Sequence, residues 1–213
     1  MADHHPVCLS DCCFDSVQRE RIRIWKDRLS GSLKPGRYRH SLSVADTAVR
    51  LAGIHDLDIL RAAQAGLLHD CAKCLSPAEM RRIAEENSLT DDETVLSEPS
   101  LLHSIVGAWV AEKQYGMSDP RVLQAIRYHN TGCAGMTRLD MCVCLADSIE
   151  PLRKPFPLLE KIRALAEVSL ERSLLLSLEA TADYVVSRGL YLHPRTGDTI
   201  RWLRELPQVK VYH

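Results

Sequence analysis

The chain has 213 residues, of which 46% are hydrophobic and 26% charged, and its formal net charge is −1 with nine histidines counted neutral. These values fit a globular protein with one sizeable core and give no sign of a broad nucleic-acid-binding face. No stretch approaches the roughly 18 apolar residues of a membrane span, and no basic region followed by an apolar one opens the chain. The sequence therefore predicts a cytoplasmic protein that binds neither membrane nor nucleic acid.

Apolar residues recur at helical spacing through most of the chain. In chain order, helices are predicted at 16–29, 37–54, 58–73, 77–87, 100–115, 120–129, 139–149, 157–188 and 194–206. Ser76, Pro77 and Glu79 form the clearest helix start, with a serine cap, a proline in the first turn and a glutamate three residues after the cap. No stretch shows sustained strand alternation, so the predicted fold class is all-α.

One helical domain is expected over residues 16–206, with a flexible lead-in at 1–15 and a tail at 207–213. The lead-in holds a cluster of potential zinc ligands: His4, His5, Cys8, Cys12 and Cys13. Their spacing matches no closed four-ligand zinc pattern, so the cluster is interpreted as part of a frayed terminus. Eight cysteines in a chain of this size favour reduced thiols over a disulfide framework.

The most informative stretch is Gly-Leu-Leu-His-Asp-Cys-Ala-Lys at 66–73. An apolar run ends there in His69 and Asp70, with Lys73 three positions after the aspartate. Ionisable side chains on a buried turn must be paired or ligated. A metal ion would satisfy the imidazole and the carboxylate, and the ammonium would meet a bound anion.

Four other residues lie in similarly apolar or small-residue surroundings on separate predicted helices: His40, His103, His129 and Asp147. A single histidine of this kind is more often a hydrogen-bonded core residue than a metal ligand. Several of them on separate helices, around one His-Asp doublet, are more simply explained by one shared metal site. Asp46, Asp140 and Glu150 are candidates to orient its imidazoles, with capping or surface roles as the alternative.

The order His40, His69-Asp70, Asp147 resembles the HD-domain phosphohydrolase superfamily, and the added His103 and His129 resemble the subset that holds two metals. The sequence around each of these residues, at 37–41, 66–73, 99–108, 125–132 and 145–153, is similar to that of the YqeK family. The resemblance extends from about residue 20 to residue 204. Asn130 departs from the family pattern, which usually has threonine at this position, but no ligand is lost.

The YqeK resemblance implies a symmetrical bis(5'-nucleosyl)-tetraphosphatase, which converts diadenosine tetraphosphate and water into two ADP molecules. It also implies two metal sites that share Asp70. One would be held by His40, His69, Asp70 and Asp147, and the other by Asp70, His103 and His129. Iron is the metal that the resemblance favours, although this ligand set also suits manganese and other divalent ions.

Carried over to this chain, the implied mechanism is attack by a hydroxide that the two metals activate. Asp70 and Lys73 are the predicted catalytic residues, with Lys73 neutralising the leaving diphosphate. Guanidinium groups bind phosphate bidentately, so Arg37, Arg127 and Arg153 join Lys73 as predicted substrate-binding residues. The alternative for each arginine is a solvated charge or an ion pair.

Two other functions fit the same motif. One is an HD-domain nucleotide phosphatase or cyclic-nucleotide phosphodiesterase with a different substrate. The other is a nucleotide-binding regulator without turnover, although the complete ligand set argues against it. The sequence allows a homodimer but does not specify one.

Overall fold

The computed structural model describes residues 14–210, and within this range every regular element is a helix, which confirms the predicted all-α fold. The first half of the chain forms α1 (Ser16–Ser32), α2 (Pro35–Ile54), α3 (Ile59–Leu68), the 3-10 helix η1 (Cys71–Cys74), α4 (Pro77–Glu86) and α5 (Glu93–Ser97). The second half forms α6 (Pro99–Lys113), α7 (Pro120–Tyr128), α8 (Arg138–Ile149), α9 (Leu159–Ala166), α10 (Leu170–Ser187), α11 (Pro194–Glu205) and α12 (Pro207–Lys210).

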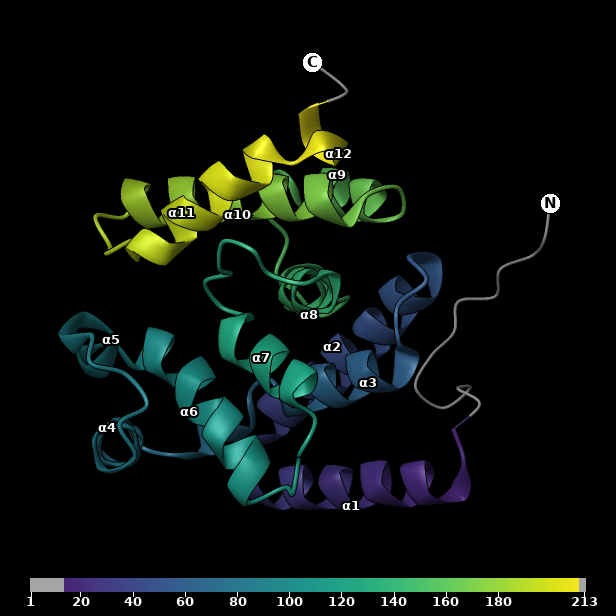
Figure 1. The fold of residues 1–213 in the computed structure, drawn as a ribbon, viewed down its shortest axis with the longest axis vertical. Coiled ribbons are helices and arrows are strands. Elements are labelled where there is room, and N and C mark those ends of the chain that lie inside the picture. The colour runs from purple at the N-terminus through teal and green to yellow at the C-terminus, as the bar shows by residue number, and fades with distance from the viewer. Residues whose placement is uncertain (1–13, 211–213) are drawn as a thin grey trace.

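Helix α8 lies at the centre of the molecule. It packs against α2, α3 and α7 on one side and against α10 on the other (Figure 1). Residues 139–146 are all buried, as expected of a helix that is apolar on every face. Helices α9 to α12 form a layer above α8 in this view, and α1 runs along the opposite edge (Figure 1). Side chains projecting from α8 therefore reach the middle of the fold.

Capping residues set the start of many of these helices. Asp15, Ser76 and Thr137 each form a capping box, in which the side chain accepts from the amide three residues on and that residue's side chain accepts from the cap amide. Six helices also carry proline in the first turn, where no backbone donor is needed: α2, α4, α6, α7, α11 and α12. The predicted start at Ser76 agrees with the structure.

Helices α2 and α3 approach each other closely at Gly66. A Cβ at this position would lie 2.9 Å from Ala45 Cα and 3.2 Å from Ala48 Cβ. Small residues on both helices therefore allow the backbones to meet, and this contact sets the distance between the residues of α2 and the end of α3. A Cβ at Gly107 of α6 would lie 3.3 Å from His69 O, so α6 also approaches the end of α3 closely.

Two predicted helices end three or more residues away from the end that the structure gives them. Helix α1 continues to Ser32 instead of stopping at Leu29, because Gly31 is compatible with a helix that still buries Leu29 and Leu33. The helix predicted over 58–73 ends at Leu68. The chain then turns at His69-Asp70 and continues as η1, with Asp70 at φ −108° and ψ 18°.

The C-terminal elements also differ from the prediction. The tract predicted over 157–188 is two helices, α9 and α10, and Ser169 caps the second by accepting from Arg172 N. The predicted tail at 207–213 begins with helix α12, which packs on α10 and α11 and buries Val209. In the predicted lead-in, Phe14 is buried and Asp15 caps α1, whereas its histidines and cysteines lie outside the described residues. Within residues 14–210, no helix has both the length and the apolar character required to cross a bilayer.

Candidate metal centre

The six predicted metal ligands come from different parts of the fold and converge beside α8. His40 lies on α2, His103 on α6 and Asp147 on α8. His69 and His129 occupy the residues that directly follow α3 and α7, and Asp70 follows His69. Of the six, only Asp147 is more than marginally accessible, with 20% of its side chain exposed.

The first group of ligand atoms surrounds His40 and His69. The Nε2 atom of His40 lies 3.0 Å from Asp147 Oδ1 and 3.3 Å from His69 Nε2. The Nε2 atom of His69 lies 3.9 Å from Asp147 Oδ1 and 3.5 Å from Asp70 Oδ2. Four side chains therefore direct nitrogen and oxygen atoms into one small volume.

The second group surrounds the other oxygen of Asp70. Asp70 Oδ1 lies 3.3 Å from His103 Nε2 and 3.8 Å from His129 Nε2, and these two nitrogens are 3.2 Å apart. The rings of His69 and His129 are 4.9 Å apart, centroid to centroid, so the two groups adjoin. Asp70 thus presents one carboxylate oxygen to each group.

Backbone hydrogen bonds fix which ring nitrogens face the carboxylates. The Nδ1 atoms of His69 and His129 lie 2.7 Å from the carbonyl oxygens of Gly66 and Ile126. A neutral imidazole that donates from Nδ1 has its lone pair on Nε2. Both Nε2 lone pairs then face the Asp70 carboxylate, so hydrogen-bond acceptors on the imidazoles and the carboxylate face one another with no proton between them.

This arrangement of lone pairs fits divalent cations. Nitrogen and oxygen acceptors at 3–4 Å from one another repel unless a cation lies between them, and imidazole with carboxylate is a common ligand set for such ions. The Nδ1 atom of His103 is also buried and without a hydrogen-bond partner among the described residues, so hydrogen bonding to protein does not explain the position of this ring. The residues present are suited to hold two ions that share Asp70.

The protonation states of His103, His129 and Asp70 agree with metal binding. Burial lowers the pKa of His103 to about 3 and that of His129 to about 4, so both rings are neutral near pH 7. Burial would also lower the pKa of His69, but the Asp70 carboxylate next to it raises that pKa above its usual value. Burial would raise the pKa of Asp70, but His69 holds it well below the usual range. Asp70 is therefore ionised.

Glu150, which follows α8, orients His40 from the side opposite the metal ligands. Its Oε1 lies 3.1 Å from His40 Nδ1, and its Oε2 accepts hydrogen bonds from Ser43 Oγ and Leu152 N, both at 2.6 Å. A buried carboxylate that accepts the Nδ1 proton directs the Nε2 lone pair of His40 towards Asp147. Asp140 does not have this role, because it belongs to the capping box of α8 and accepts from Gln124 Nε2.

Three of the four predicted cations lie beside the ligands. Arg37 Nη1 donates to Asp70 Oδ2 at 2.7 Å, and Arg153 Nη1 lies 3.8 Å from Asp147 Oδ1. Lys73 on η1 is half-buried; burial lowers its pKa, and the nearby Asp70 carboxylate raises it in part. All three are close enough to the carboxylates to interact with an anion bound at the metal ligands.

A pocket of about 450 Å³, lined in part by charged side chains, opens from His40 towards solvent. Arg37 and Arg153 line it together with Lys154, which sequence reasoning did not select. The available signal was its position directly after Arg153, in a short basic stretch that follows the helix carrying Asp147. The pocket provides a cationic approach to the ligand atoms.

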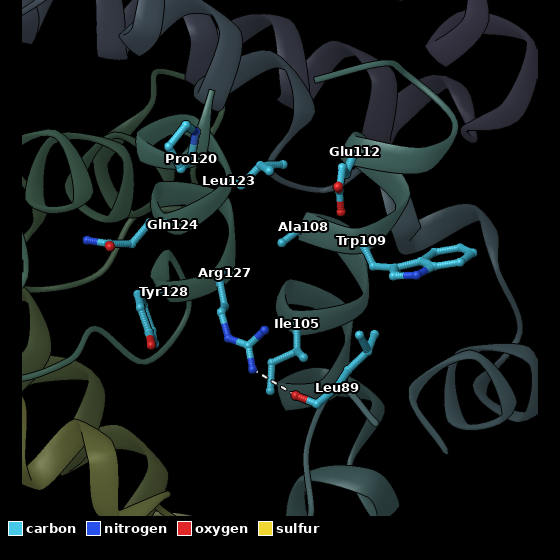
Figure 2. A pocket seen from close by; sticks show the side chains of 10 residues that line it. All are labelled: Leu89, Ile105, Ala108, Trp109, Glu112, Pro120, Leu123, Gln124, Arg127 and Tyr128. Carbon is cyan, nitrogen blue, oxygen red and sulfur yellow. Dashed lines mark hydrogen bonds between the residues drawn. The ribbon is translucent and has the colours of Figure 1, made fainter. Parts of the chain in front are cut away.

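The structure does not bring Arg127 to this cluster. Its guanidinium donates to Leu89 O at 2.7 Å inside a groove of about 300 Å³ between α6 and α7 (Figure 2). The groove is lined by Ile105, Ala108, Trp109 and Glu112 on α6. These residues lie on the face of α6 opposite His103, because they follow it by 2, 5, 6 and 9 positions, which at 100° per residue puts them about 120–180° around the helix from it. Arg127, two residues before His129, likewise faces away from the ligands, so we do not assign it to substrate.

The chain was compared with known proteins. A family model described as HD domain matches residues 37–152. A symmetrical bis(5'-nucleosyl)-tetraphosphatase from Halalkalibacterium halodurans is 36% identical over 160 residues, which cover 75% of this chain and 84% of that protein. A protein of the same name from Bacillus subtilis is 35% identical over 167 residues, with 78% and 89% covered.

A solved structure extends this likeness to the fold. The crystal structure of a predicted HD superfamily hydrolase involved in NAD metabolism, from Clostridium acetobutylicum, superposes with a TM-score of 0.82 at 37% identity. The match covers 85% of this chain and 95% of that one. From the family model, the similar sequences and the shared fold, we conclude that this chain belongs to the HD-domain family and, within it, to the group of symmetrical bis(5'-nucleosyl)-tetraphosphatases.

Proposed function

We propose that this protein hydrolyses dinucleoside tetraphosphates symmetrically, converting diadenosine tetraphosphate and water into two ADP molecules. The observation that carries the proposal is the convergence of four imidazoles and two carboxylates whose lone pairs face one another around Asp70. The relatives at 35–36% identity that bear this activity in their names support the choice of substrate.

We further propose that His40, His69, Asp70 and Asp147 hold one divalent ion and that Asp70, His103 and His129 hold a second. Bound cations of this kind lower the pKa of a coordinated water and neutralise charge on phosphate oxygens. Iron is the proposed metal, with manganese as the alternative for the same nitrogen and oxygen ligands.

The remaining roles belong to the cations beside the ligands. Arg37 and Arg153 bind phosphate oxygens and hold one central phosphorus atom near Asp70. The new bond joins the water oxygen to that phosphorus, and the bond to the bridging oxygen breaks. Lys73 neutralises the departing ADP, because its ammonium is partly desolvated beside the carboxylates.

Chromatography of the products distinguishes this function from its competitors. Symmetrical cleavage gives ADP as the only nucleotide product, asymmetrical cleavage gives ATP and AMP, and a regulator without turnover leaves the substrate intact. If the metal-loaded protein yields ATP and AMP, or degrades only nucleoside monophosphates or cyclic nucleotides, the proposal is wrong.

Substitution of Asp70 tests the residues involved. Asp70→Ala removes a ligand from both groups, so we expect turnover to fall at least a thousandfold while circular dichroism stays that of the wild type. Asp91→Ala alters an exposed carboxylate in the segment before α5 and is the matched control. Undiminished hydrolysis by Asp70→Ala would refute the assignment.

A further inference from the structure

We infer that a groove between residues 154–158 and α10 binds one nucleoside of the substrate and that Tyr184 stacks on its base. This inference rests on the proposed function for the polyphosphate part of the ligand. The groove has a volume of about 700 Å³, and none of the six metal ligands lines it.

The groove adjoins the pocket that leads to the metal ligands. Arg153 and Lys154 line both, so the two form one path along the surface. Arg153 Nη1 also lies 3.8 Å from Asp147 Oδ1, which ties this path to the metal centre. A ligand with one phosphate near Asp147 can therefore extend past two cations and into the groove.

The walls of the groove suit a flat aromatic ring. Pro155, Phe156 and Leu158 form one wall, and Ala180, Tyr184 and Val185 of α10 form the other. Phe156 is half-buried, whereas 57% of Tyr184 is exposed. An aromatic side chain beside an apolar groove is a common platform for a nucleobase, because every base has a flat face that stacks.

The charges divide the path into two parts. Arg153 and Lys154 lie where the groove meets the pocket and match the charge of the phosphates. Asp183, on the α10 wall, repels phosphate but accepts hydrogen bonds from ribose hydroxyl or base amino groups. A nucleotide would match this order of charges, with its phosphates at Arg153 and Lys154 and its nucleoside beside Asp183.

The groove between α6 and α7 lacks these features. It lies on the faces of α6 and α7 opposite His103 and His129, it shares no residue with the pocket at His40, and its arginine already donates to a backbone carbonyl (Figure 2). The groove at α10 is therefore the one that fits a nucleoside attached to bound phosphate.

Calorimetric titrations of the metal-loaded protein with ADP and with inorganic pyrophosphate test the inference. Both probes carry a diphosphate, but only ADP carries a nucleoside. For Tyr184→Ala we expect ADP to bind about tenfold more weakly, the usual effect of losing one stacked base, while pyrophosphate binds as in the wild type. The KM for diadenosine tetraphosphate should rise by a similar factor with kcat within about twofold.

Tyr191→Ala is the matched control, because Tyr191 is 52% exposed and lies outside the groove. This variant should leave unchanged the affinities for ADP and for pyrophosphate, and the KM and kcat for diadenosine tetraphosphate. Equal affinities of wild type and Tyr184→Ala for ADP, or an equal loss for ADP and pyrophosphate, would overturn the inference. If Tyr184→Ala weakens ADP alone but the wild type fails to cleave diadenosine tetraphosphate, the nucleoside site stands and the proposed function is wrong.

Discussion

Asp70 is the residue on which both groups of ligands depend. Its two oxygens face different histidine pairs, and Arg37 donates to one of these oxygens from the side of the pocket. The carboxylate can take this position because the helix ends at Leu68, which frees His69 and Asp70 from the regular i to i+4 pattern. The change from α3 to η1 also places Lys73 near Asp70, with a backbone hydrogen bond of 2.9 Å between Lys73 N and Asp70 O.

Replacing Glu150 should weaken metal binding without removing a ligand. Glu150→Gln keeps the size of the side chain but loses the charge that orients His40 Nδ1. Loss of a carboxylate that orients a metal-binding imidazole typically lowers metal affinity about ten- to a hundredfold. Competition with a chromogenic chelator measures the effect, and Glu160→Gln, at a side chain that is 82% exposed, is the control. Equal affinities in the two variants would contradict the role of Glu150.

Replacing Lys73 should affect the chemical step more than metal or substrate binding. Lys73→Gln removes the cation proposed to meet the leaving diphosphate, and loss of one such group typically costs about a hundredfold or more in kcat. Steady-state kinetics combined with metal analysis of the same sample check this. A normal kcat, or a fall in kcat that is explained by loss of bound metal, would show that Lys73 does not act in the catalytic step.

At the scale of the element, the spacing of apolar side chains predicts where helices lie better than it predicts where they end. The predicted helix at 58–73 contains no proline, and its one glycine, Gly66, lies inside α3, so no residue type in this stretch indicates that α3 stops at Leu68. The split between α9 and α10 lacks both glycine and proline, and Ser169 as a helix cap was the available signal. The helix predicted over 16–29 stops short of Gly31, but an exposed glycine is tolerated inside a helix, and α1 continues through it to Ser32.

The spacing of helices α2 and α3 depends on the absence of a side chain at Gly66. A Cβ there would meet the backbone of Ala45 at 2.9 Å, which flexible side chains cannot relieve. We expect Gly66→Ala to lower the free energy of unfolding by about 2 kcal/mol, in the range of overpacked cores. Urea denaturation of the metal-depleted protein measures it.

Gly53→Ala is the matched control for the same substitution in α2. No atom lies within 4 Å of the Cβ that it would add. Removing a helical glycine should raise the free energy of unfolding by about 0.5 kcal/mol. If Gly66→Ala is as stable as Gly53→Ala, the close contact between α2 and α3 does not limit the packing.

At the scale of the whole molecule, the sequence predicted the all-α class and the proximity of the six ligand residues better than the surfaces around them. The ligands could be selected because each ionisable group stood in apolar surroundings on a separate helix. Arg127 has the same basic side chain as Arg37 and Arg153, so only its direction from the helix, which depends on packing, separates it from them. Lys154 and Tyr184 lie on surfaces that form only when α10 packs on α8.

The buried histidines make the stability of the metal-depleted protein depend on pH. His103 and His129 have pKa values of about 3 and about 4 in the folded chain, below the ordinary 6.5, because burial penalises the charged form. The unfolded chain therefore binds more protons between pH 6.5 and pH 4. The free energy of unfolding should fall as pH drops through this window, by at most about 1.4 kcal/mol per pH unit for each histidine.

His69 acts in the opposite direction, because its pKa is raised by Asp70, and it offsets part of this loss. Urea denaturation at pH 7, 6, 5 and 4 in the presence of a chelator measures the net slope. A free energy of unfolding that rises as the pH falls would show that His103 and His129 are not held in the neutral form.

Anomalous diffraction from crystals of the metal-loaded protein tests the central claim most directly. We predict two anomalous peaks, one between His40, His69 and Asp147 and the other between His103 and His129, with the Asp70 carboxylate bridging them. Peaks only at other positions, or no peak in protein that cleaves diadenosine tetraphosphate, would contradict the account.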